Sequence, residues 1–377
     1  MNEQALAKET MDLIEKKLSL VAERSRGIIP YTTNDGRFDD TSKNSICWWT
    51  NGFFGGMMWQ LYHYSGKELY RELALDIEEK LDQNLMLPWG MDHDSGFKWL
   101  PTAVAHYKTD GSEQSFNRGI LAAENLAGRF NPQGSFIRAW NDSGDGSRAG
   151  TAIIDCMMNL PLLYWASEVT NDPRFSQIAI RHADMAEKYF IRENGSAIHI
   201  GVFDPNSGEF LHSEGGQGYA TGSSWTRGQA WALYGFTLSA IHTGKPEHLE
   251  TAKKVADNFI LQMTKWPEMG IPVDFDQPHD CKREDSSAAA IAACGLIELG
   301  KYDIKYHEAA VKLLEFLCEN RLSLDDNTDY LLWNCADSFW SNREQMTLIY
   351  ADYFLIEALL KLIDKDFPIF KPKKEAK

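Results

Sequence analysis

The chain has 377 residues, of which 44% are hydrophobic and 24% charged, a balance typical of globular proteins with a sizeable core. Its formal net charge of −16 at pH 7 argues against a nucleic-acid partner, because no basic block is available to neutralise phosphates. The charge does not exclude an acidic substrate, since a local arginine can outweigh a diffuse negative surface.

The N-terminal stretch and the cysteines indicate the compartment. "MNEQALAKETMDLIEKKLSLVAERS" is charged throughout and lacks the apolar core of a signal peptide, and no later stretch reaches about 18 apolar residues. Six cysteines are scattered without CxxC spacing, which favours reduced structural thiols. We expect a cytoplasmic protein without a membrane partner, present as a monomer or a weak homodimer.

Helical periodicity recurs from one end of the chain to the other. Short polar or Gly/Pro turns such as "YSGKELY" and "TNDPRFS" join helices two by two, and longer loops rich in glycine and aromatic residues separate the pairs. The expected helices are 3–24, 51–64, 68–85, 98–109, 112–129, 151–169, 173–192, 226–243, 246–264, 285–299, 304–321 and 343–363.

This alternation predicts an all-α fold, an (α/α)₆ toroid of six helical hairpins. The long loops would gather at one mouth and carry small β pieces such as 196–203. No linker separates two regimes of composition, so we expect a single domain over 1–377. An open superhelix of helical pairs is the alternative.

Tryptophans gather in or near the long loops of this chain. Twelve are present, and a set placed near loop–helix junctions fits a cleft for ring-shaped ligands such as sugars better than core packing alone. These tryptophans are Trp48, Trp49, Trp89, Trp99, Trp140, Trp225, Trp231, Trp266, Trp333 and Trp340.

The stretch "MDHDSGFKW" (91–99) concentrates polar groups just before an expected helix. Either Asp92 or Asp94 could cap that helix or form an Asx-turn. A metal site is disfavoured, because no second set of His, Asp or Cys lies at ligand spacing. The functional interpretation is a carboxylate held at a helix mouth and facing a cavity.

Asp155 is the one charged residue of "AIIDCMMNLPLLYWA" (152–166), a run apolar nearly all round that predicts a buried helix. Burying a carboxylate costs on the order of several kcal/mol unless it is paired or protonated. Desolvation should raise its pKa and make it a proton donor, whereas Asp94, on a glycine-containing loop, should be better solvated and ionised. Such a pair suits acid/base work on glycosidic bonds.

A third stretch, "EGGQGYATGSSWTRGQAWALYGF" (214–236), feeds a glycine-rich loop into a helix. Arg227 and Trp231 lie four residues apart and so share one helix face. No Walker lysine or strand–loop–helix frame supports a phosphate cradle. An arginine at a helix start beside tryptophans is suited to receive a carboxylate through two charge-assisted hydrogen bonds, although an ordinary ion pair is the simpler interpretation.

Four motifs together resemble the unsaturated glucuronyl hydrolases, glycoside hydrolase family 88: "HDSGF" (93–97), "IIDCMMNLPLLYWA" (153–166), "GSSWTRGQAWALYGF" (222–236) and "REDSSAAAIAACGLIEL" (283–299). The resemblance runs from about Trp49 to the helix near 360 and implies an (α/α)₆ barrel. It implies an enzyme that removes a 4,5-unsaturated uronic acid from the non-reducing end of lyase-generated oligosaccharides, with no cofactor or metal.

In that family, chemistry begins with hydration of the C4=C5 vinyl ether. The resemblance implies Asp155 as the proton donor and Asp94 as the second essential carboxylate. From its place one turn on, we expect Asn159 to orient Asp155. The implied substrate-binding residues are Arg227, Trp231, Trp225, Gln217, His199, Trp140, Trp49, His93, Ser213 and Gly215.

Other functions stay open at this level. The nearest is an unsaturated rhamnogalacturonyl hydrolase acting on pectin fragments with the same chemistry. A polysaccharide lyase or an inverting glucanase would use another reaction on a similar toroid. A non-catalytic oligosaccharide-binding protein is the alternative outside enzymes, and two carboxylates within catalytic motifs speak against it.

Overall fold

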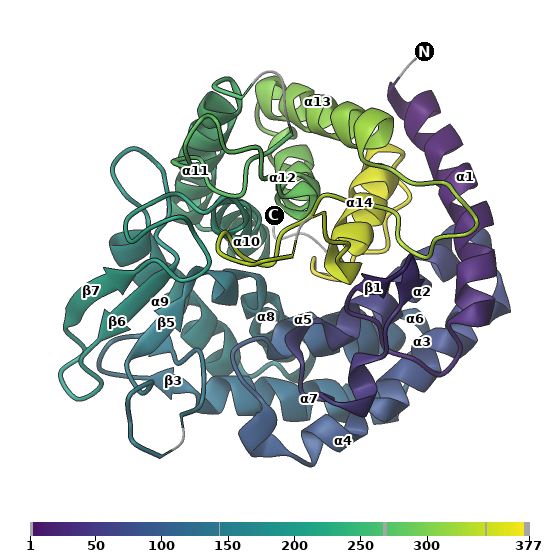
Figure 1. Ribbon diagram of the computed structural model, residues 1–377. Coiled ribbons are helices and arrows are strands. Elements are labelled where there is room, and N and C mark those ends of the chain that lie inside the picture. Colours follow the sequence, from purple (N-terminus) through teal and green to yellow (C-terminus); the bar gives the residue numbers. More distant parts are fainter. Residues whose placement is uncertain (1–2, 143, 267–269, 344, 373–377) are drawn as a thin grey trace.

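The helices that are apolar on nearly every side form an inner ring. Adjacent members contact one another all the way round, and the last returns to the first (Figure 1). The members are α2 (Phe53–Ser65), α5 (Ser95–Trp99) with α6 (Ala105–Asp110), α8 (Leu160–Thr170), α10 (Thr226–Thr243), α12 (Ser286–Leu299) and α14 (Ile349–Leu362). The computed structural model describes residues 3–142, 144–266, 270–343 and 345–372.

Helices with a polar outer face form a second ring around the first (Figure 1). These are α1 (Glu3–Arg24), α3 (Glu68–Lys80), α7 (Glu113–Gly128), α9 (Pro173–Phe190), α11 (Pro246–Met263) and α13 (Ile304–Asn320), with the short α4 (Asp82–Leu85) after α3. The closed ring confirms the predicted (α/α)₆ toroid over the open superhelix. None of the described helices is both long and apolar enough to cross a membrane.

Three predicted helices differ from those observed. The helix expected at 98–109 contains Pro101 and is interrupted by a π-helical turn, Leu100–Val104. The helix expected at 151–169 begins instead as a strand and a 3₁₀ turn, because its first residues pair with a neighbouring strand. The helix expected at 343–363 begins at Ile349, and residue 344 of that range lies outside the described residues.

Small β elements decorate the loops, as predicted for 196–203. β5 (Thr151–Ile153), β6 (Ile200–Phe203) and β7 (Phe210–Glu214) form an antiparallel sheet in that order. Two further hairpins pair β1 (Thr33–Asn34) with β2 (Arg37–Phe38) and β3 (Phe130–Asn131) with β4 (Phe136–Ile137).

A buried ionic cluster ties α12 to α14. The Lys361 ammonium lies 2.6 Å from a Glu298 oxygen, 3.5 Å from Glu357 and 3.3 Å from Asp366. The side chains of Lys361 and Glu298 are only 3% and 2% exposed. Burial raises the pKa of Glu298, but the charges of Lys361 and Lys371 outweigh burial and hold that pKa well below its usual range.

Replacing Lys361 by methionine leaves three carboxylates without this cation, so Lys361→Met should lower the free energy of unfolding by about 3–5 kcal/mol at pH 7. The lowered pKa of Glu298 means that its ionised form stabilises the fold, fully above the usual glutamate pKa of about 4.3 and progressively less below that pH. The stability difference between wild type and Lys361→Met should therefore shrink as the pH falls below about 4.3. Denaturant titrations at several pH values measure this.

Lys305 provides the matched control, since its ammonium lies 2.8 Å from Asp257 on the surface with both side chains about half exposed. Lys305→Met should cost less than about 1 kcal/mol. Equal losses for the two variants would contradict the role given to the buried cluster.

Candidate active site

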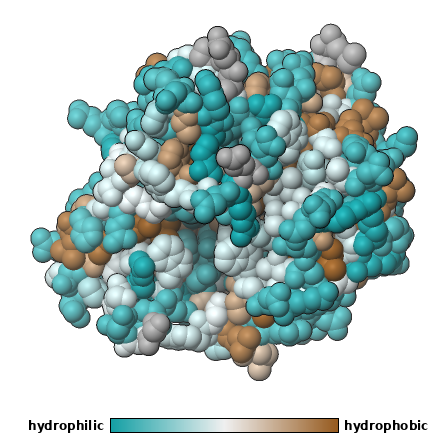
Figure 2. Space-filling view, viewed as in Figure 1, coloured by the Kyte–Doolittle hydropathy of each residue, from teal (hydrophilic) through white to brown (hydrophobic). Residues whose placement is uncertain are grey.

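A cavity of about 460 Å³ opens among the long loops at one end of the toroid. Figure 2 shows this face as largely hydrophilic and hollowed near its centre. Eight of the predicted site residues line the cavity: Trp49, His93, Asp94, Trp140, Asp155, His199, Gln217 and Arg227. The structure thus brings both predicted carboxylates and the predicted arginine to one place, although they lie far apart in the sequence.

The β5–β6–β7 sheet sets the positions of three of these residues. Pairing of β5 with β6 continues to Ile154, whose N–H donates to the His199 carbonyl at 3.0 Å. Asp155 therefore enters the cavity beside His199. Gln217 follows β7, and its backbone N–H donates to His199 Nδ1 at 3.1 Å.

That hydrogen bond assigns the tautomer of His199, since Nδ1 can accept a hydrogen bond only when it carries no proton. Nε2 then carries the proton and lies 3.6 Å from Asp155 Oδ2. Burial lowers the pKa of His199 to about 3 and that of His93 to about 4, so both rings are neutral near pH 7. Gly216 permits the approach of the loop: its φ is +61°, and a Cβ there would lie 2.1 Å from His199 Nδ1.

Asp155 is held in the 3₁₀ turn Ile154–Met158 and not in the predicted helix. Its side chain is 16% exposed, and Oδ2 has no hydrogen-bond partner among the described residues. Burial raises the pKa of Asp155 to about 7, although the charge of Arg227 acts in the opposite direction. The raised pKa agrees with the sequence prediction, and a carboxyl in this state can donate a proton near neutral pH.

The prediction for Asp94 needs correction. Asp94 precedes α5 directly, but its side chain makes no helix cap and is only 12% exposed, so it is no better solvated than Asp155. Burial, followed by the charges of Asp92 and Asp155, raises the pKa of Asp94 well above its usual range. Asp94 is thus half of a buried, mutually repelling carboxyl pair, in which two full charges are disfavoured.

Asn159 contacts this pair differently from the prediction. Its amide Nδ2 donates to Asp94 Oδ1 at 3.1 Å, whereas toward Asp155 it reaches only the backbone carbonyl, at 3.3 Å. It therefore orients the Asp94 carboxyl and not that of Asp155.

Arg227 lies in the first turn of α10 and is 1% exposed. Its Nη1 donates to Asp285 Oδ2 at 2.5 Å and to the Ala336 carbonyl, and Nη2 donates to the Asp337 carbonyl at 2.7 Å. Its guanidinium also lies 4.6 Å from the Trp225 ring centroid. With one carboxylate and two neutral carbonyls as partners, this rigidly held cation can still receive an anion from the cavity.

Four predicted binding residues do not line the cavity. Trp231 is fully buried against Phe97 and other rings of the inner ring, so it supports the site from within the core. Trp225 is 2% exposed and lies behind His199, with ring centroids 4.3 Å apart. Ser213 pairs within β7, and Gly215 meets the site only through its carbonyl, 3.4 Å from His199 Nδ1.

Sequence reasoning missed several lining residues. Trp48 was noted only as one of many tryptophans, although it lines the cavity and is 38% exposed. Ser45, Cys47 and Gly90 also line the wall, and no motif signals them. Asp92 lines the wall as well, and its Oδ1 accepts the Asp94 N–H at 3.0 Å, an Asx-type turn of the kind the sequence suggested.

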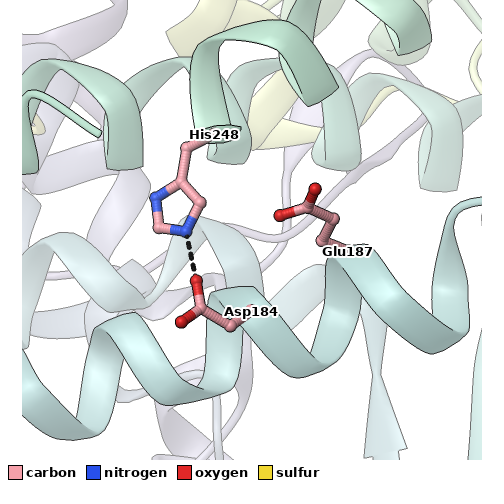
Figure 3. A group of neighbouring side chains, drawn as sticks. All are labelled: Asp184, Glu187 and His248. Carbon is pink, nitrogen blue, oxygen red and sulfur yellow. Dashed lines mark hydrogen bonds and ion pairs between the residues drawn. The ribbon is translucent and has the colours of Figure 1, made fainter. Parts of the chain in front are cut away.

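Among the described residues, the one group of side chains spaced for a metal ion lies far from this cavity, on α9 and α11. Figure 3 shows Asp184, Glu187 and His248, with His248 Nε2 directed at Asp184 at 2.8 Å. The Lys245 ammonium lies on the same Asp184 oxygen, also at 2.8 Å. A cation of the protein itself thus already neutralises this carboxylate.

Comparisons with known proteins identify relatives of this chain. The family model described as Glycosyl Hydrolase Family 88 matches residues 21–340. The unsaturated glucuronyl hydrolase of Bacillus sp. (strain GL1) is 34% identical over 336 residues, 83% of this chain and 86% of that protein. The unsaturated chondroitin disaccharide hydrolase of Streptococcus pyogenes serotype M1 is 32% identical over 83% and 80% of the two chains.

Among solved structures, a UGL variant in complex with dGlcA-Glc-Rha-Glc superimposes with a TM-score of 0.87 at 31% identity. The match covers 93% of this chain and 96% of that chain. The similarity in structure therefore extends over nearly the whole chain.

Proposed function

Because this chain belongs to glycosyl hydrolase family 88, we infer that it is a glycosidase that removes a 4,5-unsaturated uronic acid from the non-reducing end of lyase-generated oligosaccharides. The observation that carries this function to the site is one cavity holding the buried pair Asp94 and Asp155 opposite the fixed cation of Arg227.

In the proposed reaction the Asp155 carboxyl gives its proton to C4 of the vinyl ether. The C4=C5 double bond is consumed, and positive charge develops at C5, shared with the ring oxygen, where the nearby Asp94 carboxylate stabilises it. Water adds to C5 and returns a proton to Asp155. The hemiketal opens by breaking the bond between C5 and the ring oxygen, which leaves a ketone at C5 and a hemiacetal at C1. Collapse of that hemiacetal to an aldehyde breaks the glycosidic bond and releases the shortened sugar from the acyclic keto acid.

Arg227 is the proposed partner of the uronate carboxylate. A planar guanidinium presents parallel N–H groups that match a carboxylate, and Asp285 with the carbonyls of Ala336 and Asp337 holds it in one orientation. Trp140, Trp48 and Trp49 supply apolar walls for a sugar ring. Relatives named for unsaturated glucuronyl and unsaturated chondroitin disaccharide hydrolases support this activity over the unsaturated rhamnogalacturonyl alternative.

We also propose that the enzyme works in the cytoplasm. All six cysteines are free thiols, which suits a reducing compartment. Fractionation of the producing cells, followed by immunodetection, tests this proposal.

The purified protein should remove the near-ultraviolet absorbance of unsaturated disaccharides produced by polysaccharide lyases, because hydration destroys the double bond that absorbs. The assay is run without added metal and with a saturated glucuronide as control. Turnover of the saturated compound at the same rate, with the unsaturated one untouched, would contradict the proposed function.

Loss of a general acid typically lowers the rate by about 10²–10⁴-fold. Asp155→Asn should therefore nearly abolish kcat while binding persists, and Asp94→Asn should also be severely impaired. In the wild type, activity requires Asp155 to be protonated, so it should fall as the pH rises through about 7. Retention of more than about a tenth of kcat in Asp155→Asn would assign the proton transfer elsewhere.

Arg227→Lys keeps a positive charge but loses the planar fork of N–H groups. We expect KM to rise by about tenfold or more, the worth of one charge-assisted hydrogen bond, with a smaller change in kcat. Steady-state kinetics on the unsaturated disaccharide measures the two parameters. An unchanged KM would show that Arg227 does not receive the substrate carboxylate.

A further inference from the structure

One fully buried amide links the Asp94 carboxyl to the backbone of the turn that carries Asp155. Asn159 is 0% exposed and closes the 3₁₀ turn that carries Asp155. Its Nδ2 donates to Asp94 Oδ1 at 3.1 Å and to the Asp155 carbonyl at 3.3 Å, while its Oδ1 accepts the Phe97 N–H at 2.8 Å. The side-chain amide is therefore fixed at both ends and cannot turn to reverse its oxygen and nitrogen without losing these partners.

Close contact with α5 holds Asn159 in this place. A Cβ on Gly96 would lie 2.5 Å from Asn159 Cα and 2.7 Å from its Oδ1, so only glycine allows the two segments to meet here. This explains the glycine of "HDSGF" by packing against the turn that carries the other carboxyl.

The contacts of the two carboxyls are unequal. Asp94 accepts the Asn159 N–H, whereas Asp155 Oδ2 has no hydrogen-bond partner among the described residues. Donation from an N–H stabilises an ionised carboxylate over its protonated form. In a buried pair that disfavours two charges, the Asn159 donation favours charge on Asp94, whereas Arg227 and a backbone N–H favour charge on Asp155.

The charged and titratable groups around the pair come from several elements. Asp94 faces Asp92 and His93 of its own loop and Lys98 of α5, whose fully buried ammonium lowers the pKa of Asp94 as Asn159 does. Asp155 faces His199 next to β6 and Arg227 of α10, and Arg129 and Cys156 lie nearby. Arg227 favours charge on Asp155 and Asp92 disfavours charge on Asp94, so Lys98 and Asn159 are the groups that act in favour of charge on Asp94.

We propose that Asn159 is the positioning residue of this pair: its amide makes Asp94 the ionised member and leaves the proton on Asp155. The proposal rests on the reaction outlined above, which needs that order, and adds the group that sets it. Asn159 itself exchanges no proton and touches no reacting atom.

The order of ionisation is measured by carboxyl ¹³C NMR on protein labelled at aspartate, with Asp94→Asn and Asp155→Asn used to assign the two signals. In the wild type, the Asp94 signal should titrate at lower pH than the Asp155 signal. In Asn159→Ala the Asp94 titration should move up by about one to two pH units, the worth of one hydrogen bond to a charged group. Ionisation of Asp155 before Asp94 in the wild type would overturn the proposal.

The pH–rate profile of Asn159→Ala distinguishes a positioning role of Asn159 from a purely structural one. Activity needs Asp94 ionised and Asp155 protonated, so in Asn159→Ala the acid limb of the pH–rate profile should move to higher pH and the active range should narrow. KM should change less than about threefold, because a positioning role leaves the binding groups in place. A lower kcat with both limbs unmoved would show that Asn159 only supports the fold.

Gly96→Ala tests the same contact without removing any functional group, since the added methyl displaces Asn159. It should shift the Asp94 titration in the same direction as Asn159→Ala. Gly119→Ala is the matched control: its Cβ would lie 2.6 Å from the Trp165 side chain, an equally tight contact between helices. An equal shift in this control would attribute the effect to general loosening and overturn the proposal.

The NMR titration requires no substrate. Failure of the protein to bleach unsaturated disaccharides is therefore a result about the proposed function, and the order of ionisation is a result about Asn159.

Discussion

The site depends on two buried carboxyl groups, Asp94 and Asp155, that lie close enough for the charge of one to disfavour ionisation of the other. Burial of both carboxyls makes the second negative charge expensive, so the pair retains a proton near neutral pH. The inner ring supplies the apolar surroundings, since nearly every side chain of α10, α12 and α14 is buried. The loops supply the unequal contacts that distinguish the two carboxyls. A single fold thus provides both a held proton and a place for charge.

Arg227 likewise depends on contacts that come from outside the cavity wall. A buried guanidinium is tolerated because Asp285 and backbone carbonyls partner it, and Asp285 also accepts hydrogen bonds from Ser287. These partners belong to the start of α12 and to the loop before α14. The electrostatics of the cavity therefore depend on residues that do not line it and that come from the last part of the ring.

The sequence was most informative where periodicity is long. Nine of the twelve expected ranges are matched by observed helices with bounds within a few residues, the range 68–85 by α3 and α4 together, because amphipathic or wholly apolar runs of three or more turns leave little ambiguity. It failed at 151–158, where apolar residues without a period suit a strand and a 3₁₀ turn as well as a helix.

The site residues followed the same rule. Asp155 and Arg227 were recognisable because a charge in an apolar context is conspicuous, whereas Ser45 and Cys47 reach the cavity only through loop geometry. The sequence identified Asp94 as a site residue but could not predict that it is buried. Its burial depends on Gly96 packing against a turn some sixty residues away in the chain. Trp231 illustrates the reverse error: it shares a helix face with Arg227, yet that face turns into the core one turn beyond the cavity.

Closure of the ring also fixes when the site can come into being during synthesis. Arg227 and Gln217 are anchored by the carbonyls of Ala336 and Asp337, and α14 must then seal against α2. A nascent chain that has left the ribosome only as far as α12 carries Asp94, Asp155 and Arg227 but lacks the two backbone carbonyls that complete the anchoring of the guanidinium. Such a chain is an unclosed arc with apolar inner helices exposed, so the fold and the anchoring of Arg227 are completed together by the last hairpin.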